Sequence, residues 1–481
     1  MRRAKIVCTL GPATSTRERI RELVDAGMDV ARFNLSHGSL AEHERVYRLV
    51  REASDETGRA VGVLVDLQGP KIRLGSFIDG SVTVAEGDRF TITTRDVLGT
   101  REECSTTYTG LPQDVRAGDE ILIDDGQVRV RVEYVDGTDV HTVVEIGGRI
   151  SNHKGLNLPG VAVSVPAVSG KDIDDLRWAL QLRADWIALS FVRSAKDVEE
   201  VRRVMRAEGV LLPVIAKIEK PQAVDNLEEI VDVFDGFMVA RGDLGVEMPL
   251  EIVPSVQKRI IERARVHAKP VIVATQMLES MISAPRPTRA ETSDVANAVL
   301  DGADAVMLSG ETSIGDYPIK TVETMRRIIA ATESQGLERM SAIHWSPRSK
   351  SGVICKAAAE VAERTRAKFL VAFTTSGDSA RRMSRYRSAV PVLAFTPHAA
   401  VRSQLSLTWG IETFLVPMVE HTDEMVRQVD QSLLEIGRCS EGELVVIVAG
   451  SPPGIAGSTN ALRVHQMGDA INGVAPAYRR G

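Results

Sequence analysis

The sequence predicts a protein of the α/β class whose largest domain is a closed parallel β-barrel surrounded by helices. Three observations predict it. Eight short apolar runs, rich in Val, Ile and Ala, do not alternate with polar residues, as is typical of strands buried on both faces of a parallel sheet. Amphipathic helical stretches separate the runs. Every run ends in polar residues, which would converge at one mouth of a barrel.

These runs are the predicted strands of a TIM (β/α)8 barrel, and they cover residues 5–10, 29–35, 60–66, 185–191, 213–218, 236–240, 270–275 and 305–308. The stretches 17–26, 255–268 and 294–301 are typical of the intervening helices, and Gly302 provides a stop for the last of them. A doubly wound open sheet is the alternative. It is disfavoured because its ligand would use only the switch point rather than the ends of all strands.

A long segment between the third and fourth runs, from about residue 71 to residue 165, has a different character. Turn signals rich in Gly and Asp, such as Asp79-Gly80 and Asp125-Gly126, separate alternating runs such as 128–132. This pattern predicts an all-β insert built of hairpins. Because a structureless loop of this length is implausible, we expect a small domain on the mouth side of the barrel, able to close over a site as a lid.

A third segment, again α/β, follows a Ser-rich link near residues 341–351. Its predicted strands are 369–373, 391–395, 413–416 and 444–449. The predicted boundaries are therefore 1–70 with 167–338 for the barrel, 71–166 for the lid and 339–481 for the carboxyl-terminal domain. At roughly 150 residues per domain, a chain of 481 residues favours about three domains.

The composition excludes several functional classes. A net charge of −6, without a long basic block, argues against a nucleic-acid binder that neutralises phosphates. No apolar run approaches the roughly 18 residues that a membrane span needs, and the apolar stretch 6–10 is too short for a signal peptide. The four cysteines are scattered, which fits a reducing compartment better than a disulfide framework. We therefore expect a cytoplasmic protein without nucleic-acid or membrane partners.

The strongest chemical signal lies at the ends of the fifth and sixth predicted strands. Glu219 and Asp243 follow adjacent strands, so their carboxylates can share one hard divalent cation such as Mg²⁺ or Mn²⁺. Lys217 precedes Glu219 by two residues and therefore points to the same side of the strand. An ammonium fixed beside a divalent cation stabilises negative charge on an enolate or phosphoryl oxygen. A plain Lys–Glu ion pair at the barrel rim is the alternative interpretation.

Further polar residues end other strands. Arg32, Asn34, Ser36 and His37 follow the second strand, and arginine offers a bidentate fork for phosphate or carboxylate. Thr275 ends the seventh strand. Each of these residues alone is more often a cap or a turn residue than a ligand. The common nucleotide and metal motifs G-x-x-x-x-G-K-[ST], G-x-G-x-x-G after a strand and H-E-x-x-H are absent, so a nucleotide would be held by another device.

Taken together and in order, these segments resemble the pyruvate kinase family. The resemblance covers essentially the whole chain, and the predicted lid lies where the family carries one. The motifs are KIVCTLGP at 5–12, NLSHG at 34–38, DLQGPKIR at 66–73, KGLNLPG at 154–160, IAKIE at 215–219, ARGDLG at 240–245, ATQML at 274–278 and LSGET at 308–312.

The resemblance implies phosphoryl transfer from phosphoenolpyruvate to ADP, giving pyruvate and ATP in the last step of glycolysis, by a homotetramer. It implies that Glu219 and Asp243 bind Mg²⁺ or Mn²⁺, and that Lys217 and Arg32 contact the phosphoryl group. Arg73 is expected to add positive charge around the same group and so to be catalytic as well. The resemblance also implies that Gly242, Asp243 and Thr275 bind the substrate carboxylate. It implies that the nucleotide is bound by Asn34, Ser36, His37, Arg73 and Lys154. The enolate is expected to be protonated near Thr275, with Ser309 and Glu311 as a relay.

One segment departs from the commoner pattern of the family. Many members bind K⁺ through residues matching Asn34, Ser36, Asp66 and the carbonyl of Leu67, and they carry glutamate where this chain has Lys71. The exchange replaces a negative charge by a positive one. We therefore hypothesise that the Lys71 ammonium takes over the charge of K⁺, so that activity does not require K⁺. A solvated hinge lysine is the alternative.

The carboxyl-terminal domain carries a candidate phosphate loop, Thr374-Thr375-Ser376-Gly377-Asp378-Ser379, between a predicted strand and a helix. Its hydroxyls and backbone amides suit a phosphate, although, taken alone, an ordinary capped turn explains it better. The family uses this loop for sugar-phosphate effectors. With a second glycine-rich segment at 450–454 and 457–460, the pattern resembles bacterial members activated by AMP or a sugar monophosphate such as glucose 6-phosphate more than it resembles members that use fructose 1,6-bisphosphate.

Two other functions fit part of the pattern. A barrel lyase that forms pyruvate enolate on Mg²⁺, of the aldolase or citrate-lyase kind, would use the same carboxylates, but it has no need of a lid that grips a nucleotide. An inactive sensor of phosphorylated metabolites is expected to lose Lys217 or a metal carboxylate, and all of them are present. Turnover of phosphoenolpyruvate that depends on ADP separates the three.

Overall fold

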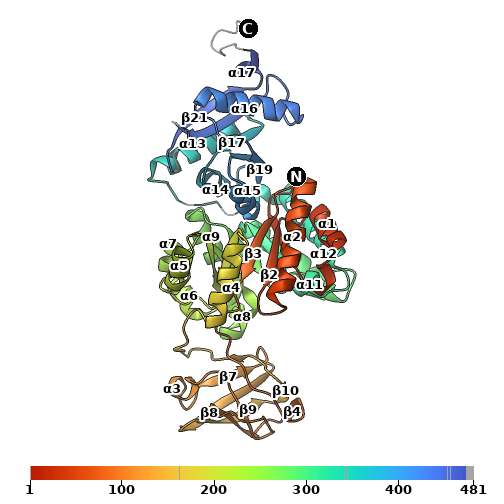
Figure 1. The fold of residues 1–481 in the computed structure, drawn as a ribbon, viewed down its shortest axis with the longest axis vertical. Helices are drawn as coiled ribbons and strands as arrows, with labels where there is room; N and C mark the ends of the chain where they lie inside the picture. The colour runs from red at the N-terminus through yellow and green to blue at the C-terminus, as the bar shows by residue number, and fades with distance from the viewer. Residues whose placement is uncertain are drawn as a thin grey trace.

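Figure 1 shows the fold as a computed structural model, which describes residues 2–161, 163–340, 342–343, 345–451, 453–454 and 457–472. Three bodies follow one another along the long axis: the lid, drawn in orange, the barrel in the middle, and the carboxyl-terminal domain, drawn in blue (Figure 1). Ser341 of the predicted link, Pro452 of the second glycine-rich segment and residues 473–481 lie outside the described residues. Within the described ranges, no helix is long and apolar enough to cross a membrane.

The eight predicted runs form a closed parallel barrel in the strand order β1-β16-β15-β14-β13-β12-β3-β2, which confirms the predicted fold class. The strands are β1 (Lys5–Thr9), β2 (Val30–Asn34), β3 (Gly62–Asp66), β12 (Trp186–Leu189), β13 (Val214–Ile218), β14 (Gly236–Ala240), β15 (Val271–Ala274) and β16 (Ala305–Leu308). Every strand lies inside its predicted run, because strands buried on both faces leave a continuous apolar stretch in the sequence.

Helices surround the barrel. They are α1 (Arg17–Ala26), α2 (Leu40–Thr57), α4 (Gly170–Gln181), α5 (Asp197–Ala207), α6 (Pro221–Asp225), α7 (Leu227–Val233), α8 (Arg241–Glu247), α9 (Val253–Val266), α10 (Arg289–Asp301), α11 (Gly310–Ser313) and α12 (Pro318–Gly336). Short 3₁₀ turns are η1 (Pro12–Thr14), η2 (Leu250–Ile252), η3 (Glu279–Ile282) and η4 (Leu337–Arg339).

Side-chain caps decide where several of these helices begin. The sequence Thr288-Arg289-Ala290-Glu291 predicts an N-cap at Thr288, and the structure confirms it. The hydroxyl of Thr288 accepts the backbone N–H of Glu291, and the Glu291 carboxylate accepts the N–H of Thr288 in return, so α10 begins at Arg289, before the apolar stretch 294–301. Gly302 ends the same helix in the left-handed conformation, as predicted. The apolar pattern located the buried face of α10, whereas the cap fixed its first turn.

The barrel interior is a dry apolar cluster that reaches the carboxyl-terminal domain. Inward side chains of all eight strands, among them Trp186 and Ile272, pack into one cluster that also contains Leu407. Leu407 ends the 3₁₀ turn η5 (Leu405–Leu407) of the carboxyl-terminal domain. Gly62 allows this close approach, because a β-carbon there would lie 2.6 Å from Ser406 Oγ. Leu407 therefore closes the base of the barrel, at the end away from the lid.

The inserted segment forms the lid. Its elements are β4 (Ser81–Val84), β5 (Arg89–Thr93), β6 (Glu103–Ser105), a short helix α3 (Leu111–Asp114), β7 (Glu120–Ile123), β8 (Val128–Asp136), β9 (Asp139–Ile146), β10 (Gly148–Ser151) and β11 (Leu156–Asn157). The main sheet runs β11-β7-β8-β9-β5-β6, and β10 pairs with β4. The predicted hairpins β7-β8 and β8-β9 are antiparallel, but β6 lies parallel to β5 and α3 interrupts the strands. Turn signals specify local hairpins and not the order of a sheet.

The carboxyl-terminal domain is a five-stranded sheet in the order β19-β18-β17-β20-β21. Its elements are α13 (Lys350–Arg364), β17 (Phe369–Phe373), α14 (Asp378–Ser384), β18 (Val392–Thr396), α15 (Ala399–Gln404), β19 (Ile411–Leu415), α16 (Thr422–Glu435), β20 (Leu444–Gly450), β21 (Thr459–Gln466) and α17 (Asp469–Asn472). The four predicted strands are present. The sequence prediction missed β21, an antiparallel edge strand whose exposed polar residues leave no apolar run.

Candidate active site

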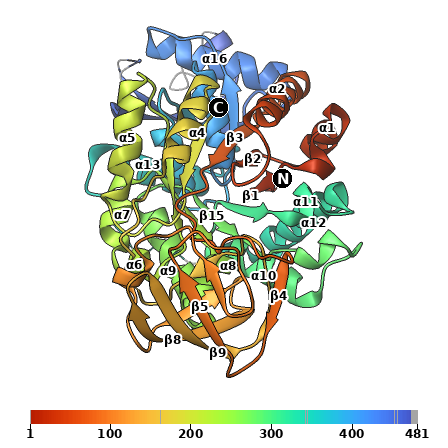
Figure 2. The same ribbon diagram turned by 60° about the horizontal axis from the view of Figure 1, so that its bottom comes forward.

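The carboxyl ends of the barrel strands face the lid, and a cleft lies between the two bodies. Figure 2 brings the lid to the front, with α6, α8 and α9 of the barrel beside it. One wall of the cleft consists of the two chain segments that join lid to barrel, and the other of loops that follow barrel strands. The residues that line it include Pro70, Lys71, Ile72, Leu156, Asn157, Phe191, Lys220 and Asp243.

Alternating charges lie across the barrel mouth beside this cleft. Arg32 donates from Nε to Asp66 Oδ2 at 2.8 Å, and its Nη2 lies 2.6 Å from the same oxygen. Lys217 Nζ lies 3.3 Å from Asp66 Oδ1 and 2.8 Å from Glu219 Oε1. Burial would raise the pKa of Asp66, but Lys217 and Arg32 outweigh burial and hold that pKa below its ordinary value. Four residues thus form one ionic network: Arg32 of β2, Asp66 of β3, Lys217 of β13 and Glu219, which directly follows β13.

Lys217 is held in place as a permanent cation. Its Nζ donates to Ser190 Oγ at 2.8 Å, and Ser190 Oγ donates to the carbonyl of Leu67 at 2.8 Å. Burial alone would lower the pKa of Lys217, but the carboxylates of Asp66 and Glu219 raise it above its ordinary value. The Lys–Glu ion pair considered as the alternative therefore exists. It belongs to a larger network that fixes a charged ammonium at the mouth of the barrel.

Glu219 and Asp243 fit a hard divalent cation. Glu219 is 1% exposed, and its Oε2 accepts the backbone N–H of Phe191 at 2.7 Å. Burial raises the pKa of Glu219; Lys217 opposes this rise and the charge of Asp243 adds to it, so a further cation is favourable here. Asp243 lines the cleft, and its carboxylate makes no hydrogen bond or ion pair with any residue that the structure describes. Two carboxylates with open positions suit Mg²⁺, which keeps water and substrate oxygens among its ligands.

Thr275 lies beside Gly242 at the ends of β15 and β14. Its Oγ1 accepts the backbone N–H of Gly242 at 2.7 Å and donates to the carbonyl of Ala274 at 2.6 Å. Thr275 adopts a left-handed backbone, with φ of 71°, and Arg241 donates to its carbonyl at 2.7 Å. The structure therefore brings together Thr275, Gly242 and the neighbouring Asp243, the three residues expected around a substrate carboxylate.

Glu311 braces two loops at the barrel mouth. It is 2% exposed, and its two carboxylate oxygens accept the backbone N–H groups of Ser309, at 2.7 Å, and Leu278, at 3.1 Å. Burial raises the pKa of Glu311. The structure places Ser309 and Glu311 side by side after β16, and both oxygens of the carboxylate point to backbone amides.

The residues expected to contact a nucleotide come from two bodies. Asn34 ends β2, Ser36 and His37 follow it, and Asn34 Oδ1 accepts the N–H of Ser36 at 3.2 Å. Arg73 and Lys154 lie on the two segments that join lid to barrel; Arg73 donates to the carbonyl of residue 153 at 3.0 Å, and Lys154 Nζ lies 2.9 Å from an aspartate of the lid. Across the described ranges, no hydrogen bond or ion pair joins the two groups.

Lys71 crosses between the two segments that join lid to barrel. A β-carbon at Gly155 would lie 3.0 Å from Lys71 Cε, so the lysine side chain runs directly over this glycine. Lys71 lines the cleft and forms no ion pair with any described residue. Asn34 and Asp66 stand opposite each other in the register of β2 and β3. Asp66 is paired with Arg32 and Lys217 rather than with Lys71.

A buried glutamate that the sequence prediction missed connects lid and barrel. Glu247, at the end of α8, is 5% exposed, and its Oε1 accepts from Asn157 Nδ2 at 3.0 Å and from Lys220 Nζ at 2.5 Å. Asn157 belongs to the lid strand β11, whereas Lys220 follows Glu219. Two sequence features could have pointed to this contact. Asn157 lies in the motif KGLNLPG, and Glu247 lies four residues after Asp243. Glu247 therefore links the lid to the helix that carries Asp243.

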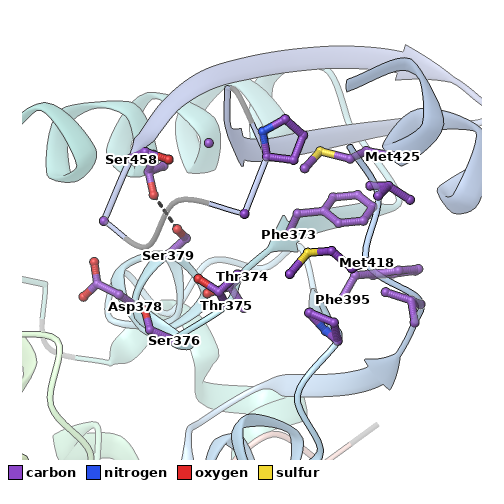
Figure 3. A pocket seen from close by; sticks show the side chains of 18 of the residues that line it. Phe373, Thr374, Thr375, Ser376, Asp378, Ser379, Phe395, Met418, Met425 and Ser458 are labelled. Carbon is purple, nitrogen blue, oxygen red and sulfur yellow. Dashed lines mark hydrogen bonds between the residues drawn. The ribbon is translucent and has the colours of Figure 1, made fainter. Parts of the chain in front are cut away.

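The candidate phosphate loop borders a pocket in the carboxyl-terminal domain. Thr374 Oγ1 accepts the N–H of Gly377 at 2.8 Å, so the loop is also a capped turn. Figure 3 shows the hydroxyl side chains on one side of the pocket and apolar side chains on the other. The polar side consists of Thr374, Thr375, Ser376, Asp378, Ser379, Ser458 and Thr459, and the apolar side of Phe373, Phe395, Val416, Met418, Val419 and Met425. The second glycine-rich segment contributes Gly450, Pro453, Gly454 and Gly457.

Comparisons with known proteins agree with this arrangement. The family model described as "Pyruvate kinase, barrel domain" matches residues 1–322, and that described as "Pyruvate kinase, alpha/beta domain" matches residues 352–465. The chain is 60% identical to the pyruvate kinase of Mycobacterium intracellulare, over 97% of this chain and 99% of that protein, and 58% identical to that of Corynebacterium glutamicum, over 97% and 98%. A crystal structure of a pyruvate kinase from Cryptosporidium parvum matches with a TM-score of 0.91 at 34% identity, over 97% of this chain and 96% of that one.

Proposed function

The chain belongs to the pyruvate kinase family and is a phosphotransferase, and from this premise we propose that it transfers the phosphoryl group of phosphoenolpyruvate to ADP in the last step of glycolysis. The observation that carries the proposal is the network of Arg32, Asp66, Lys217 and Glu219 at the barrel mouth beneath the lid. Phosphoryl transfer needs positioned positive charge more than covalent catalysis.

In this proposal, Lys217 and Arg32 hold the transferring phosphoryl group. The Lys217 ammonium also faces the enolate oxygen that the departing phosphoryl group leaves behind. Its contacts with Asp66, Glu219 and Ser190 fix it in advance, which removes the cost of reorienting it. Glu219 and Asp243 would hold a divalent cation, which would supply further positive charge to the substrate. Gly242 and Thr275 orient the substrate carboxylate beside Asp243.

The lid is proposed to help bind the second substrate, ADP, and to exclude water from the cleft. Arg73 and Lys154 lie on its joining segments and, with Asn34, Ser36 and His37 of the barrel, are the proposed contacts of ADP. Closure would prevent water from accepting the phosphoryl group in place of ADP. The enolate is then protonated near Thr275, and Ser309 with Glu311 is the proposed relay through water. The engaged hydroxyl of Thr275 means that such a proton comes by way of solvent.

A coupled pyruvate-release assay with phosphoenolpyruvate, ADP and Mg²⁺ tests the reaction. We expect turnover that requires both substrates and the metal. Pyruvate formed without ADP would favour the barrel lyase, and binding of phosphoenolpyruvate without turnover, even with AMP and glucose 6-phosphate added, would favour the sensor. Either result would contradict the proposed function.

The link through Glu247 predicts a specific effect on ADP. Asn157→Ala removes the contact of the lid with Glu247 and leaves the ion pair with Lys220 intact. A hydrogen bond to a charged group contributes about 1.5–3 kcal/mol, and about 1.4 kcal/mol corresponds to a factor of ten. We expect the KM for ADP to rise about tenfold while the KM for phosphoenolpyruvate changes less than about twofold, as measured by steady-state kinetics.

Asn152→Ala is the matched control for this prediction. Asn152 is also a lid asparagine, but its side chain accepts the backbone N–H of Phe77 inside the lid. Asn152→Ala removes the side-chain hydrogen bond of a lid asparagine without loosening the lid from the barrel. Equal changes in both variants, or a rise in KM for phosphoenolpyruvate alone, would contradict the role given to Asn157.

The hypothesis on Lys71 predicts activity without K⁺. The lysine brings an ammonium without a carboxylate partner into the cleft, next to the loops that carry Asp243. We expect less than about a twofold change in kcat when tetramethylammonium replaces K⁺ at equal ionic strength. Lys71→Glu restores the commoner charge and is expected to make activity depend on K⁺. A several-fold loss of wild-type activity without K⁺ would contradict the hypothesis.

We further propose that the pocket of Figure 3 binds an activating phosphate monoester, AMP or a sugar monophosphate such as glucose 6-phosphate. Hydroxyls from two separate loops, around Thr375 and Ser458, face one another across it and suit a phosphate group. The apolar wall of Phe373, Met418 and Met425 suits the remainder of a ligand with an apolar face, such as a nucleobase.

Activation by such an effector has a direct test. Allosteric couplings amount to about 5–150-fold in affinity, so we expect AMP or glucose 6-phosphate to lower the half-saturating phosphoenolpyruvate concentration at least about fivefold. Thr375→Glu places a carboxylate in the pocket and is expected to abolish this shift. Thr365→Glu, on an exposed threonine at the end of α13, is the control. Failure of both effectors to move the saturation curve of the wild type would refute the proposal.

We also propose the predicted boundaries 1–70 with 167–338, 71–166 and 339–481 for the three domains. The last barrel strand before the insert ends at Asp66, and the next one begins at Trp186. A homotetramer in the cytoplasm is proposed from the family alone.

A further inference from the structure

A second cavity, of about 520 Å³, lies between the base of the barrel and the carboxyl-terminal domain. It is distinct from the catalytic cleft, which lies at the opposite end of the barrel strands. Basic side chains dominate its wall: Arg202, His267 and Lys269 come from the barrel, and Arg381 and Arg382 come from α14. We call this cavity the basal cavity.

The carboxylates of the basal cavity are already neutralised. Asp235 pairs with Arg202, and Asp378 Oδ2 lies 2.6 Å from Arg382 Nε. These are the two acidic residues of its wall. Arg202 and Arg382 therefore neutralise the two carboxylates, so an anionic ligand would not meet an unpaired carboxylate in this cavity.

Lys269 and Arg381 carry positive charges that make no direct ion pair with a described acidic side chain. Lys269 Nζ donates to the backbone carbonyls of Val231, at 2.6 Å, and Asp232, at 3.2 Å. Arg381 Nη2 donates to the carbonyl of Ser376 at 3.1 Å. In the described part of the chain, neither side chain lies within ion-pair distance of an acidic group. Burial lowers the pKa of both residues, and it outweighs the opposing effect of nearby carboxylates, Asp235 on both and also Asp232 on Lys269 and Asp378 on Arg381.

A third cation lies deeper, behind these two. Lys269 and Arg381 also line a small inner cavity, whose wall includes Arg385. Arg385 is 2% exposed and lies over the ring of Trp345, and its Nη1 donates to the carbonyl of Val266 at 2.8 Å. Its Nε and Nη2 are buried without a hydrogen-bond acceptor. Orphaned donors on a buried charge cost free energy unless a further acceptor is supplied.

We propose that the basal cavity binds a phosphate dianion, either inorganic phosphate or the phosphate of a small monoester, with Lys269 and Arg381 as its main ligands. Phosphate brings the negative charge and the acceptor oxygens that these side chains lack. A guanidinium fork beside an ammonium is a common combination for this anion. Trp186 and Val401 form an apolar part of the wall, against which the organic portion of a monoester can pack.

The basal cavity shares a wall with the pocket of Figure 3. Ser376 and Asp378 line both cavities. Arg381 and Arg382 hold these two residues from the side of the basal cavity. A phosphate that recruits Arg381 alters the support of the loop, so the two sites are coupled, and by linkage each ligand changes the affinity for the other by the same factor. This coupling rests on the effector role proposed for the loop, whereas binding to the basal cavity does not.

Calorimetric titration of the full-length protein with inorganic phosphate tests the site. The titration is made on Thr375→Glu, which disfavours phosphate in the pocket of Figure 3, and on the same variant with Lys269→Gln or Arg381→Gln added. We expect Thr375→Glu alone to retain phosphate binding and each added change to weaken it at least about tenfold, since a charge-assisted hydrogen bond contributes about 1.5–3 kcal/mol. Lys368→Gln, a surface lysine paired with Glu443, is the matched control.

The outcomes separate the alternatives. Loss of all phosphate binding in Thr375→Glu, or affinities for the Lys269→Gln and Arg381→Gln proteins equal to that of the Lys368→Gln control, would overturn the proposal. The two test residues lie in different domains, so a shared loss with unchanged thermal unfolding in phosphate-free buffer does not reflect misfolding. Tighter binding of methyl phosphate than of inorganic phosphate would identify a monoester as the ligand, and the reverse would identify the free anion; both support the site. This test measures phosphate binding and not turnover, so its result stays valid even if the pyruvate-release assay contradicts the proposed function.

Discussion

Replacing Lys217 by methionine is expected to lower kcat about 10³-fold. Removal of one preorganised donor to a developing oxyanion costs about 10²–10³-fold in known enzymes, and Lys217 brings a full charge as well as its hydrogen bonds. Its ammonium is buried and held by Asp66, Glu219 and Ser190. Methionine keeps the length of the chain and removes the charge. Single-turnover kinetics with saturating substrates would measure the loss.

Stability has to be separated from catalysis in this variant. Removing one partner of a buried ion pair costs about 3–5 kcal/mol, and Lys217 has two carboxylate partners. Lys217→Arg keeps the positive charge, so it is expected to unfold near the wild-type temperature and still lose most of its activity, because a planar guanidinium does not reproduce the position of the ammonium. Lys258→Met, which removes an ion pair with Asp301 outside the cleft, is the control. A Lys217→Met protein that is folded and loses less than tenfold in kcat would contradict the role of Lys217.

Replacing Glu219 by glutamine is expected to raise the Mg²⁺ concentration for half-maximal activity at least about tenfold and to lower kcat about 10²-fold. Glutamine has a similar shape, but it removes one of the two carboxylates that fit the cation, and hard cations prefer charged oxygen ligands. Direct binding of Mn²⁺, followed by electron paramagnetic resonance without substrates, gives a readout that does not depend on turnover.

The matched control for the metal prediction is Glu333→Gln. Glu333 is also buried, and its carboxylate accepts the N–H groups of Arg3 and Ala4 at the base of the barrel, far from the cleft. It is expected to lower stability and to leave Mn²⁺ affinity unchanged. Equal Mn²⁺ affinity in wild type and Glu219→Gln would exclude Glu219 as a ligand.

Much of the fold was predictable because its elements leave local patterns. Each barrel strand is an uninterrupted apolar run, and the polar residues that follow, such as Lys217 and Asp243, lie at the mouth by the geometry of a parallel barrel. The edge strand β21 was missed because an exposed strand carries no such run. Sheet order in the lid was missed because it depends on pairing between segments that are distant along the chain.

The contacts that fix the site were less accessible to prediction. Glu247 accepts a hydrogen bond from Asn157, which lies 90 residues away along the chain, and no local sequence pattern links the two residues. Asp66 was predicted only as part of a monovalent-cation site, whereas the structure uses it to hold both Arg32 and Lys217. The orientation of Lys71 over Gly155 likewise depends on the approach of two separate segments. Long-range charge pairing, rather than local propensity, sets the detailed geometry of this mouth.

The position of Leu407 has a consequence for how the chain folds during synthesis. All eight barrel strands, ending with Ala305–Leu308, leave the ribosome well before Leu407 does. Until then the nascent barrel has an open base, and apolar residues such as Trp186 that later pack in one cluster with Leu407 lie within reach of water. A chain cut after α12 would keep this defect permanently and is therefore prone to aggregate. The carboxyl-terminal domain thus supplies the last structural part of the barrel core, and a newly made molecule buries the base of its barrel only after this domain has been synthesised.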